Sequence, residues 1–201
     1  DNRTFSLILD EDISLLDELL ASYPAQYSVP DGEHLKFWTN KERTDRHGKP
    51  YTPSPGRVVQ TSLRDLDTHK EHYCKVPEDH IVIDFDLTDS FGNKSLERNL
   101  EAAASWPATY AEISTSGGGV HLHYRWTGGT PELLSRVYAP GIEVKVYTGD
   151  SSLRRRLTRC NDIPVADLST RLSFKEGPVY NPETVMNEVA LRKLIQKNLR
   201  K

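Results

Sequence analysis

The sequence predicts an α+β fold on three observations. Residues 80–126 have the pattern of a strand, a helix and two strands in that order, and two further strands are expected at 142–147 and 153–160. Amphipathic helices are expected near both ends of the chain, the first over residues 10–21. With 201 residues, the chain is long enough for one domain, or for one large and one small domain, around a sizeable hydrophobic core.

The N-terminal part combines one helix with long loops. Residues 10–21 place leucine and isoleucine on one stripe, with acidic residues near the start, where the helix dipole favours them. Prolines and charged residues alternate through 23–56, which indicates loops. A short strand at 57–61 and one or two capped helical turns at 62–73 are expected to follow.

Clear boundary signals mark the later elements. Ser95 is a good N-cap, and the helix that it begins ends before Pro107. The strands at 109–113 and 120–126 are separated by a glycine-rich turn of the right length for a hairpin. The last helix begins at Asn181, a cap followed by proline at the first helical position.

The composition indicates a globular protein of the cytoplasm with no membrane partner. Hydrophobic residues make up 36% and charged residues 27%, and the sequence shows neither a long apolar run nor a secretory signal. Cys74 and Cys160 lie far apart, so we expect two buried thiols rather than a disulfide or a zinc knuckle. The chain begins with Asp and stops in a basic helix, so we expect a piece of a longer polypeptide.

Asp84 and Asp86 are the first chemically informative pair. Strand residues two apart point to the same face, about 7 Å apart along the chain, so both carboxylates project together from the strand at 80–87. They repel each other unless a cation lies between them, and such carboxylates suit Mg²⁺ or Mn²⁺. The alternative is a strand end whose aspartates cap a helix or face water.

Residues 114–119 form the second feature, a Ser-Thr-Ser-Gly-Gly-Gly turn. Glycines leave backbone N–H groups accessible to an anion, and Ser114 and Ser116 add hydroxyl donors. His121 and His123 share one face of the following strand, so one of them would lie beside whatever the turn holds. The alternative is an ordinary hairpin tip followed by two surface histidines.

The third feature combines an acidic residue with a cluster of arginines. Glu143 and Lys145 share one face of the strand at 142–147, and Glu143 is a natural third metal ligand beside the aspartates. The arginines at 154–156 suit a triphosphate clamp, because guanidinium groups bind phosphate oxygens in pairs. Solvent-facing charges and a basic edge strand are the alternatives for these residues.

Together, these features resemble the archaeo-eukaryotic-type primases, in particular the primase-polymerases of phages, plasmids and other mobile elements. The family pattern is a hydrophobic-Asp-hydrophobic-Asp strand, then a loose Ser-x-Gly-x-Gly-x-His motif, then an acidic residue between hydrophobic ones. It matches Asp84 with Asp86, residues 116–121, and Glu143, and it covers about residues 78–165.

The resemblance implies a fold and a domain plan. An RRM-like antiparallel catalytic sheet with helices, at about 78–177, would join an N-terminal αβ lobe at about 1–77, so that residues 1–177 form the catalytic domain. Residues 178–201 would be a linker and helix leading to a missing C-terminal region, either helical or a helicase. A bacterial, phage or plasmid protein of the cytosol is implied.

The implied activity is template-directed nucleotidyl transfer by a DNA primase and polymerase, with single-stranded DNA template, primer and nucleoside triphosphates as partners. One or two Mg²⁺ or Mn²⁺ ions would be held by the catalytic residues Asp84, Asp86 and Glu143. The implied nucleotide-binding residues are Ser114, Ser116, Gly117, Gly119, His121, Lys145, Arg155 and Arg156. Strand alternation places the two arginines on opposite faces, so the choice between them stays open.

Two other functions are compatible with the sequence. His121-Leu122-His123 fits the His-hydrophobic-His pattern of replication-initiator and relaxase nucleases, whose tyrosine nucleophile could be Tyr124, Tyr138 or Tyr147. That reading leaves Asp84 and the glycine turn without a role. A catalytically inactive nucleic-acid-binding module with the same fold is the third possibility.

Overall fold

The computed structural model of the protein describes residues 14–28, 43–44, 47–51, 59, 61–129, 135–149 and 151–172. The chain divides into two compact units, Asp1–Arg171 and Leu172–Lys201, and every element named below belongs to the first. The linker and helix expected at 178–201 lie outside the described residues. In the part of the chain that the structure describes, no helix is long and apolar enough to cross a membrane.

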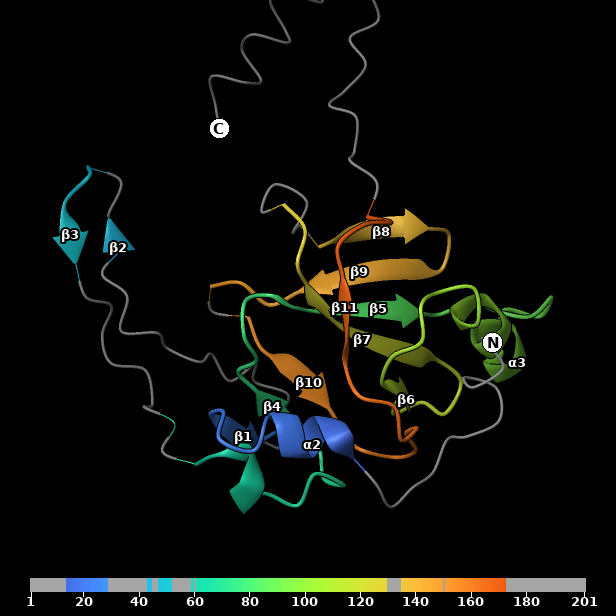
Figure 1. The fold of residues 1–201 in the computed structure, drawn as a ribbon, viewed down its shortest axis with the longest axis horizontal. Coiled ribbons are helices and arrows are strands. Elements are labelled where there is room, and N and C mark those ends of the chain that lie inside the picture. The colour runs from blue at the N-terminus through green and yellow to red at the C-terminus, as the bar shows by residue number, and fades with distance from the viewer. Residues whose placement is uncertain are drawn as a thin grey trace, which may run out of the picture. The chain divides into compact units, whose positions relative to one another are not determined.

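A six-stranded sheet carries most of the residues singled out by the sequence. Its strand order is β11-β7-β5-β9-β8, with β6 also paired to β7 (Figure 1). Every pairing in this large sheet is antiparallel except that of β11 with β7. The strands are β5 (His80–Phe85), β6 (Ala111–Ile113), β7 (Val120–Trp126), β8 (Arg136–Ala139), β9 (Ile142–Val146) and β11 (Ala166–Leu168).

Helix α3 (Leu96–Ala103) packs against β5 and β7 of this sheet. The helix begins where Ser95 Oγ accepts a hydrogen bond from the Arg98 amide at 3.4 Å, which satisfies one of its unpaired N–H groups. Beyond the helix, the Trp106 ring lies 6.1 Å from Phe85 and 6.4 Å from Tyr124, so aromatic packing fills this side. By strand alternation, Asp84 points to the opposite face.

A second layer covers part of that opposite face. It consists of the sheet β1-β4-β10, helix α2 (Leu15–Leu19) and the 3-10 turn η1 (Leu63–Asp65). Its strands are β1 (Ala25–Tyr27), β4 (His72–Cys74) and β10 (Leu153–Arg155). Leu16, Cys74 and Leu153 of this layer share one buried cluster with Val82 of β5, so the two sheets pack against each other there (Figure 1). A separate hairpin pairs β2 (Arg43–Thr44) with β3 (Pro50–Tyr51).

The α+β class and the mainly antiparallel arrangement are confirmed, as are the strands at β5, β7 and β9 and the Ser95 cap. The two cysteines are both fully buried and form no disulfide, as expected. Of the helix expected at 10–21, the described part forms a helix over Leu15–Leu19.

Several boundaries differ from the sequence-based expectation. Residues 23–56 are not only loops, because strand β1 lies there. The segment expected to form helical turns over 62–73 ends in strand β4 instead. The strand expected over 153–160 ends at Arg155, and β8 and β11 had no strand signal. Most of 57–61 lies outside the described residues. The unexpected strands β1, β4, β8 and β11 have three or four residues each, too few to show a clear alternation of apolar and polar residues.

Candidate functional site

The strand register places four polar side chains in one row across the large sheet. Asp84 of β5 lies directly opposite His121 of β7 on one side and Glu143 of β9 on the other. His121 is in turn opposite Glu112 of β6. Directly opposed residues project to the same face with Cβ atoms about 5 Å apart, so Glu143, Asp84, His121 and Glu112 form a continuous polar row.

Asp84 lies at the centre of this row, with an imidazole on one side and an ammonium group on the other. His121 Nε2 lies 3.2 Å from its Oδ1, and Lys145 Nζ lies 3.6 Å from its Oδ2. Burial raises the pKa of Asp84, but nearby His121 and Lys145 lower it more, so the pKa falls below its usual value. Asp84 Oδ1 is nevertheless a buried oxygen without a well-formed hydrogen bond to any described residue, which leaves it able to accept a positive partner.

Lys145 bridges the two predicted ligands that the register brings together. It forms an ion pair with Glu143 as well as with Asp84. Desolvation lowers the pKa of Lys145, yet these two carboxylates raise it overall, so the ammonium group is charged at neutral pH. The position between Asp84 and Glu143 is therefore one where the protein stabilises positive charge.

Asp86 lies beyond the end of β5, beside the glycine turn. Its backbone N–H donates to Gly141 O at 2.7 Å, and its Oδ1 accepts a hydrogen bond from Lys94 Nζ at 2.6 Å. A Cβ atom on Gly119 would lie only 2.8 Å from the same Oδ1, so the carboxylate approaches the turn closely. The three predicted acidic residues thus lie on one face, with Asp86 nearer the turn than the other two.

Hydrogen bonds within the glycine turn hold it in shape. Gly119 N–H donates to Ser114 Oγ at 2.9 Å, Gly117 N–H donates to Ser114 O at 2.9 Å, and the Ser114 and Ser116 hydroxyls lie 2.9 Å apart. Gly117 has φ +78°, a conformation that favours glycine. Because both of these amides donate inside the turn, its serine hydroxyls are the better candidates for anion contacts.

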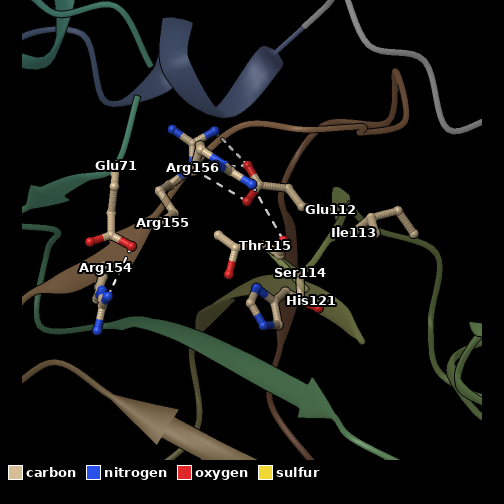
Figure 2. A pocket seen from close by; sticks show the side chains of 9 residues that line it. All are labelled: Glu71, Glu112, Ile113, Ser114, Thr115, His121, Arg154, Arg155 and Arg156. Carbon is tan, nitrogen blue, oxygen red and sulfur yellow. Dashed lines mark hydrogen bonds and ion pairs between the residues drawn. The ribbon is translucent and has the colours of Figure 1, made fainter. Parts of the chain in front are cut away.

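A cavity of about 270 Å³ opens between His121 and the arginines of β10 (Figure 2). Four of the predicted nucleotide-binding residues line it, namely Ser114, His121, Arg155 and Arg156. Its other lining residues are Arg154, which belongs to the predicted arginine cluster, and four residues that the sequence-based prediction did not include: Glu71, Glu112, Ile113 and Thr115. Ser116, Gly117, Gly119 and Lys145, together with the acidic residues Asp84, Asp86 and Glu143, are not among the lining residues.

Arg155 and Arg156 have different environments, as strand alternation requires. Arg155 is 2% exposed and forms ion pairs with Glu112 (2.5 Å) and with Asp17 of α2. Arg156 is exposed, and among the described residues its one hydrogen bond is long, 3.4 Å to Thr115 O. Arg156 therefore has its guanidinium group available to a ligand in the cavity, whereas the Arg155 guanidinium joins the two sheets.

Glu112, His121 and His123 together could hold a metal ion, since one ligand atom from each lies within 4.8 Å of the others. Among the described residues this is the only such group of three, so Asp84, Asp86 and Glu143 do not form an equally compact set. Sequence reasoning missed Glu112. The sequence feature that could have identified Glu112 is its position two residues before Ser114. This spacing places Glu112 and Ser114 on the face of the hairpin that carries His121.

Burial and charge set the protonation of this group. Burial alone would raise the pKa of Glu112, but Arg155 and His123 hold it well below its usual value, so Glu112 is ionised. Burial lowers the pKa of His123, and Glu112 only partly opposes this effect, so the imidazole is neutral at neutral pH. An ionised carboxylate and a neutral imidazole are the forms that bind metal ions.

Comparisons with known proteins identify no family for this chain: no protein-family model matches it, and no curated protein matches it. The site residues therefore carry the functional inference. They offer three carboxylates on one face of a sheet, a histidine beside them, and an adjoining cavity with serine, threonine and arginine side chains. That arrangement suits a ligand with both a metal-binding part and an anionic part.

Proposed function

We propose that this protein is a nucleotidyltransferase, a DNA primase-polymerase that adds nucleotides to a primer on a DNA template. The observation that carries the proposal is the cross-strand row of Glu143, Asp84 and His121 beside a cavity that Arg156 lines. Carboxylates for metal ions, next to donors for phosphate oxygens, are what phosphoryl and nucleotidyl transfer need. The primase-type fold with an RRM-like catalytic sheet belongs to the same proposal.

Asp84, Asp86 and Glu143 would hold one or two Mg²⁺ or Mn²⁺ ions. The fit is supported by the buried Asp84 Oδ1, which lacks a good hydrogen bond within the described part of the chain, and by Lys145, whose ammonium group lies at a position between Asp84 and Glu143 that favours a cation. Lys145 and Lys94 would have to give up their carboxylate contacts. When bound, such ions stabilise the attacking and leaving oxygens of the transfer.

The remaining residues would bind and orient the nucleotide. Arg156 and His121 would contact phosphate oxygens from opposite sides of the cavity, and the Ser114 hydroxyl would donate to them (Figure 2). Lys145 would balance charge that develops on the phosphates. Arg155 would be a positioning residue: its guanidinium group holds Glu112, which lies opposite His121 on the neighbouring strand.

Partners and location follow from this function. Single-stranded DNA template, primer and nucleoside triphosphates would be the ligands, in the cytoplasm of a bacterium or as the product of a phage or plasmid. A C-terminal helical or helicase region of the same polypeptide would follow the segment at 178–201. The catalytic domain would span 1–177, with its lobes meeting near 77.

Primer extension tests the proposal directly. The purified protein is incubated with a labelled primer on a longer DNA template, with deoxynucleotides or ribonucleotides and with Mg²⁺ or Mn²⁺. We expect products lengthened by template-specified nucleotides, and no extension in the presence of a chelator. An absence of incorporation with both metals and both kinds of nucleotide, while the protein still binds the primer-template, would indicate an inactive binding module and overturn the proposal.

The glycine turn offers a test of Asp86 placement. A Cβ atom at Gly119 would lie 2.7 Å from Ser114 Oγ and 2.8 Å from Asp86 Oδ1, so Gly119→Ala must displace one or both side chains. We expect nucleotide incorporation to fall about 10- to 100-fold, because displacements near 1 Å in an active site have costs of that size. Steady-state kinetics of single-nucleotide incorporation measures this change.

Gly149→Ala is the matched control for this substitution. Gly149 has φ +64° and nothing within 4 Å of an added Cβ, so alanine there introduces backbone strain of about 1 kcal/mol without moving a site residue. Its melting temperature should fall slightly while incorporation per folded molecule is retained. Equal losses of incorporation in the two variants would contradict the placement of Asp86 beside the turn.

A tyrosine nuclease of the His-hydrophobic-His type is less well supported, although the group of Glu112, His121 and His123 is suited to a metal ion. Tyr124 and Tyr138 contact Trp106, on the face of the large sheet opposite His121. Tyr147 is 9% exposed and belongs to the core cluster between the sheets. None of these three candidates is placed to attack a phosphate held at His121.

A further inference from the structure

We propose that Glu112, His121 and His123 form a binding site for a transition-metal ion of the Zn²⁺ class, separate from the acidic site at Asp84, Asp86 and Glu143. The ligands come from two paired strands: Glu112 lies on β6, and both histidines lie on β7. One ligand atom from each residue lies within 4.8 Å of the other two. The site does not depend on the proposed nucleotidyl transfer.

His123 supplies an independent sign of a missing partner. Its side chain is fully buried, yet its Nε2 atom has no hydrogen-bond partner among the residues that the structure describes and lies 3.7 Å from Glu112 Oε2. Buried polar atoms are nearly always paired, so an unpaired imidazole nitrogen facing a carboxylate oxygen is unusual. In a tetrahedral zinc site, ligand atoms lie roughly 3.4 Å apart, so small side-chain rotations would bring this pair to coordinating separation.

Each of the three ligands has a polar group of another residue close to it. His80 Nε2 lies 3.0 Å from His123 Nδ1, and Asp84 Oδ1 lies 3.2 Å from His121 Nε2. Glu112 Oε1 accepts hydrogen bonds from the Tyr110 hydroxyl at 2.7 Å and from Arg155. Metal-binding histidines and carboxylates are characteristically oriented by such outer contacts, which also fix the tautomer of the imidazole.

The charge around the site favours a cation despite the nearby arginine. Arg155 is shared between Glu112 and Asp17, so it does not neutralise Glu112 alone. Asp84 adds another carboxylate beside His121. Lys145 is likewise shared, between Asp84 and Glu143. Four carboxylates therefore face two cations, Arg155 and Lys145, and a divalent cation would improve the local balance.

The ligand types select the metal. Two imidazoles and one carboxylate suit Zn²⁺ or Co²⁺, whereas Mg²⁺ prefers sites made of oxygen ligands. Glu112 and His121 also line the cavity beside Arg156, so a fourth coordination position could open towards that cavity (Figure 2). The structure thus separates two kinds of metal chemistry on neighbouring parts of one sheet.

Metal binding without nucleotide or DNA tests the site. Chelator-treated protein is titrated with Co²⁺ and followed by visible absorption, and Zn²⁺ is measured by equilibrium dialysis against an excess of Mg²⁺. We expect one tightly bound ion, a Co²⁺ spectrum typical of nitrogen and oxygen ligands in low coordination number, and no displacement by Mg²⁺. Displacement of the ion by Mg²⁺ would overturn the proposal.

Variants locate the ion. His121→Ala, whose side chain is 22% exposed in the native protein, and His123→Gln should each weaken Zn²⁺ binding at least about 100-fold. Glu143→Gln and the exposed His69→Ala should bind Zn²⁺ as the parent does. Should the buried His123→Gln fail to fold, as judged by circular dichroism, His121→Ala decides the question.

The outcomes separate this site from the proposed enzyme activity. Unchanged Zn²⁺ affinity in His121→Ala, or a loss in Glu143→Gln as large as in His121→Ala, would overturn the separate site and leave the primer-extension result untouched. Conversely, Zn²⁺ binding that requires His121 but not Glu143 supports the site even in a protein that incorporates no nucleotide.

Discussion

Asp84→Asn should lower kcat/KM for nucleotide incorporation about 10³-fold, the largest effect expected of any single substitution on activity. Asp84 lies directly opposite both His121 and Glu143, so its carboxylate connects the proposed metal ligands with the proposed phosphate contacts. Asparagine keeps the shape but removes the charge. A loss of about 4 kcal/mol of transition-state stabilisation corresponds to this factor, and single-nucleotide incorporation kinetics with Mn²⁺ measures it.

Stability must be separated from activity in this experiment. Asp84 is partly buried among His121 and Lys145, and Lys145 keeps its Glu143 partner in the variant, so we expect the melting temperature to change little. Glu101→Gln, an exposed acid of α3 on the other side of the sheet, removes the same charge elsewhere and should retain full activity. Incorporation by Asp84→Asn at a tenth of the parent rate or more would exclude Asp84 as a metal ligand.

The central strands and their polar row were accessible to sequence reasoning because they follow simple periodicity. Strand β5 is a run of buried residues interrupted by the partly buried Asp84, and β9 alternates Val144 and Val146 with Glu143 and Lys145. A two-residue period fixes which side chains share a face. It does not fix which strands are neighbours, so only the structure places Asp84 between His121 and Glu143.

The second layer could not be predicted in the same way. Strands β1, β4 and β10 have three residues each, and their pairing joins segments that lie far apart in the sequence. The ion pairs of Arg155 likewise connect residues 138 and 43 positions away, Asp17 and Glu112. The sequence around Arg155 has no local pattern that points to Asp17 or Glu112. The sequence therefore indicated the run of arginines only as a candidate phosphate clamp.

This second layer makes Arg155 the residue whose loss should most reduce stability. The Arg155 guanidinium contacts Glu112 of the large sheet and Asp17 of α2, and its Nη1 lies 3.3 Å from His72 Nε2 of β4. Glu112 is 2% exposed, so Arg155→Ala leaves a carboxylate buried without its main partner. Breaking such a pair costs about 3–5 kcal/mol, and we expect the melting temperature to fall by about 10 °C.

Arg154→Ala provides the control on the same strand. Arg154 is 54% exposed and its ion pair with Glu71 lies at the surface, where such pairs contribute about 0–1 kcal/mol. Equilibrium unfolding in urea should therefore separate the two neighbours clearly. A similar, small loss of unfolding free energy in both variants would show that Arg155 does not hold the sheets together.

A double substitution distinguishes the buried charge from lost packing as the cause. In Glu112→Gln combined with Arg155→Ala, neither sheet carries an uncompensated buried charge at this point, and the lost side-chain volume at Arg155 is the same as in Arg155→Ala alone. The double variant should be more stable than Arg155→Ala, and the two changes should be strongly non-additive in a double-mutant cycle. Additive losses would instead assign the instability of Arg155→Ala to the lost side-chain volume, because the removal of Glu112 would then relieve nothing.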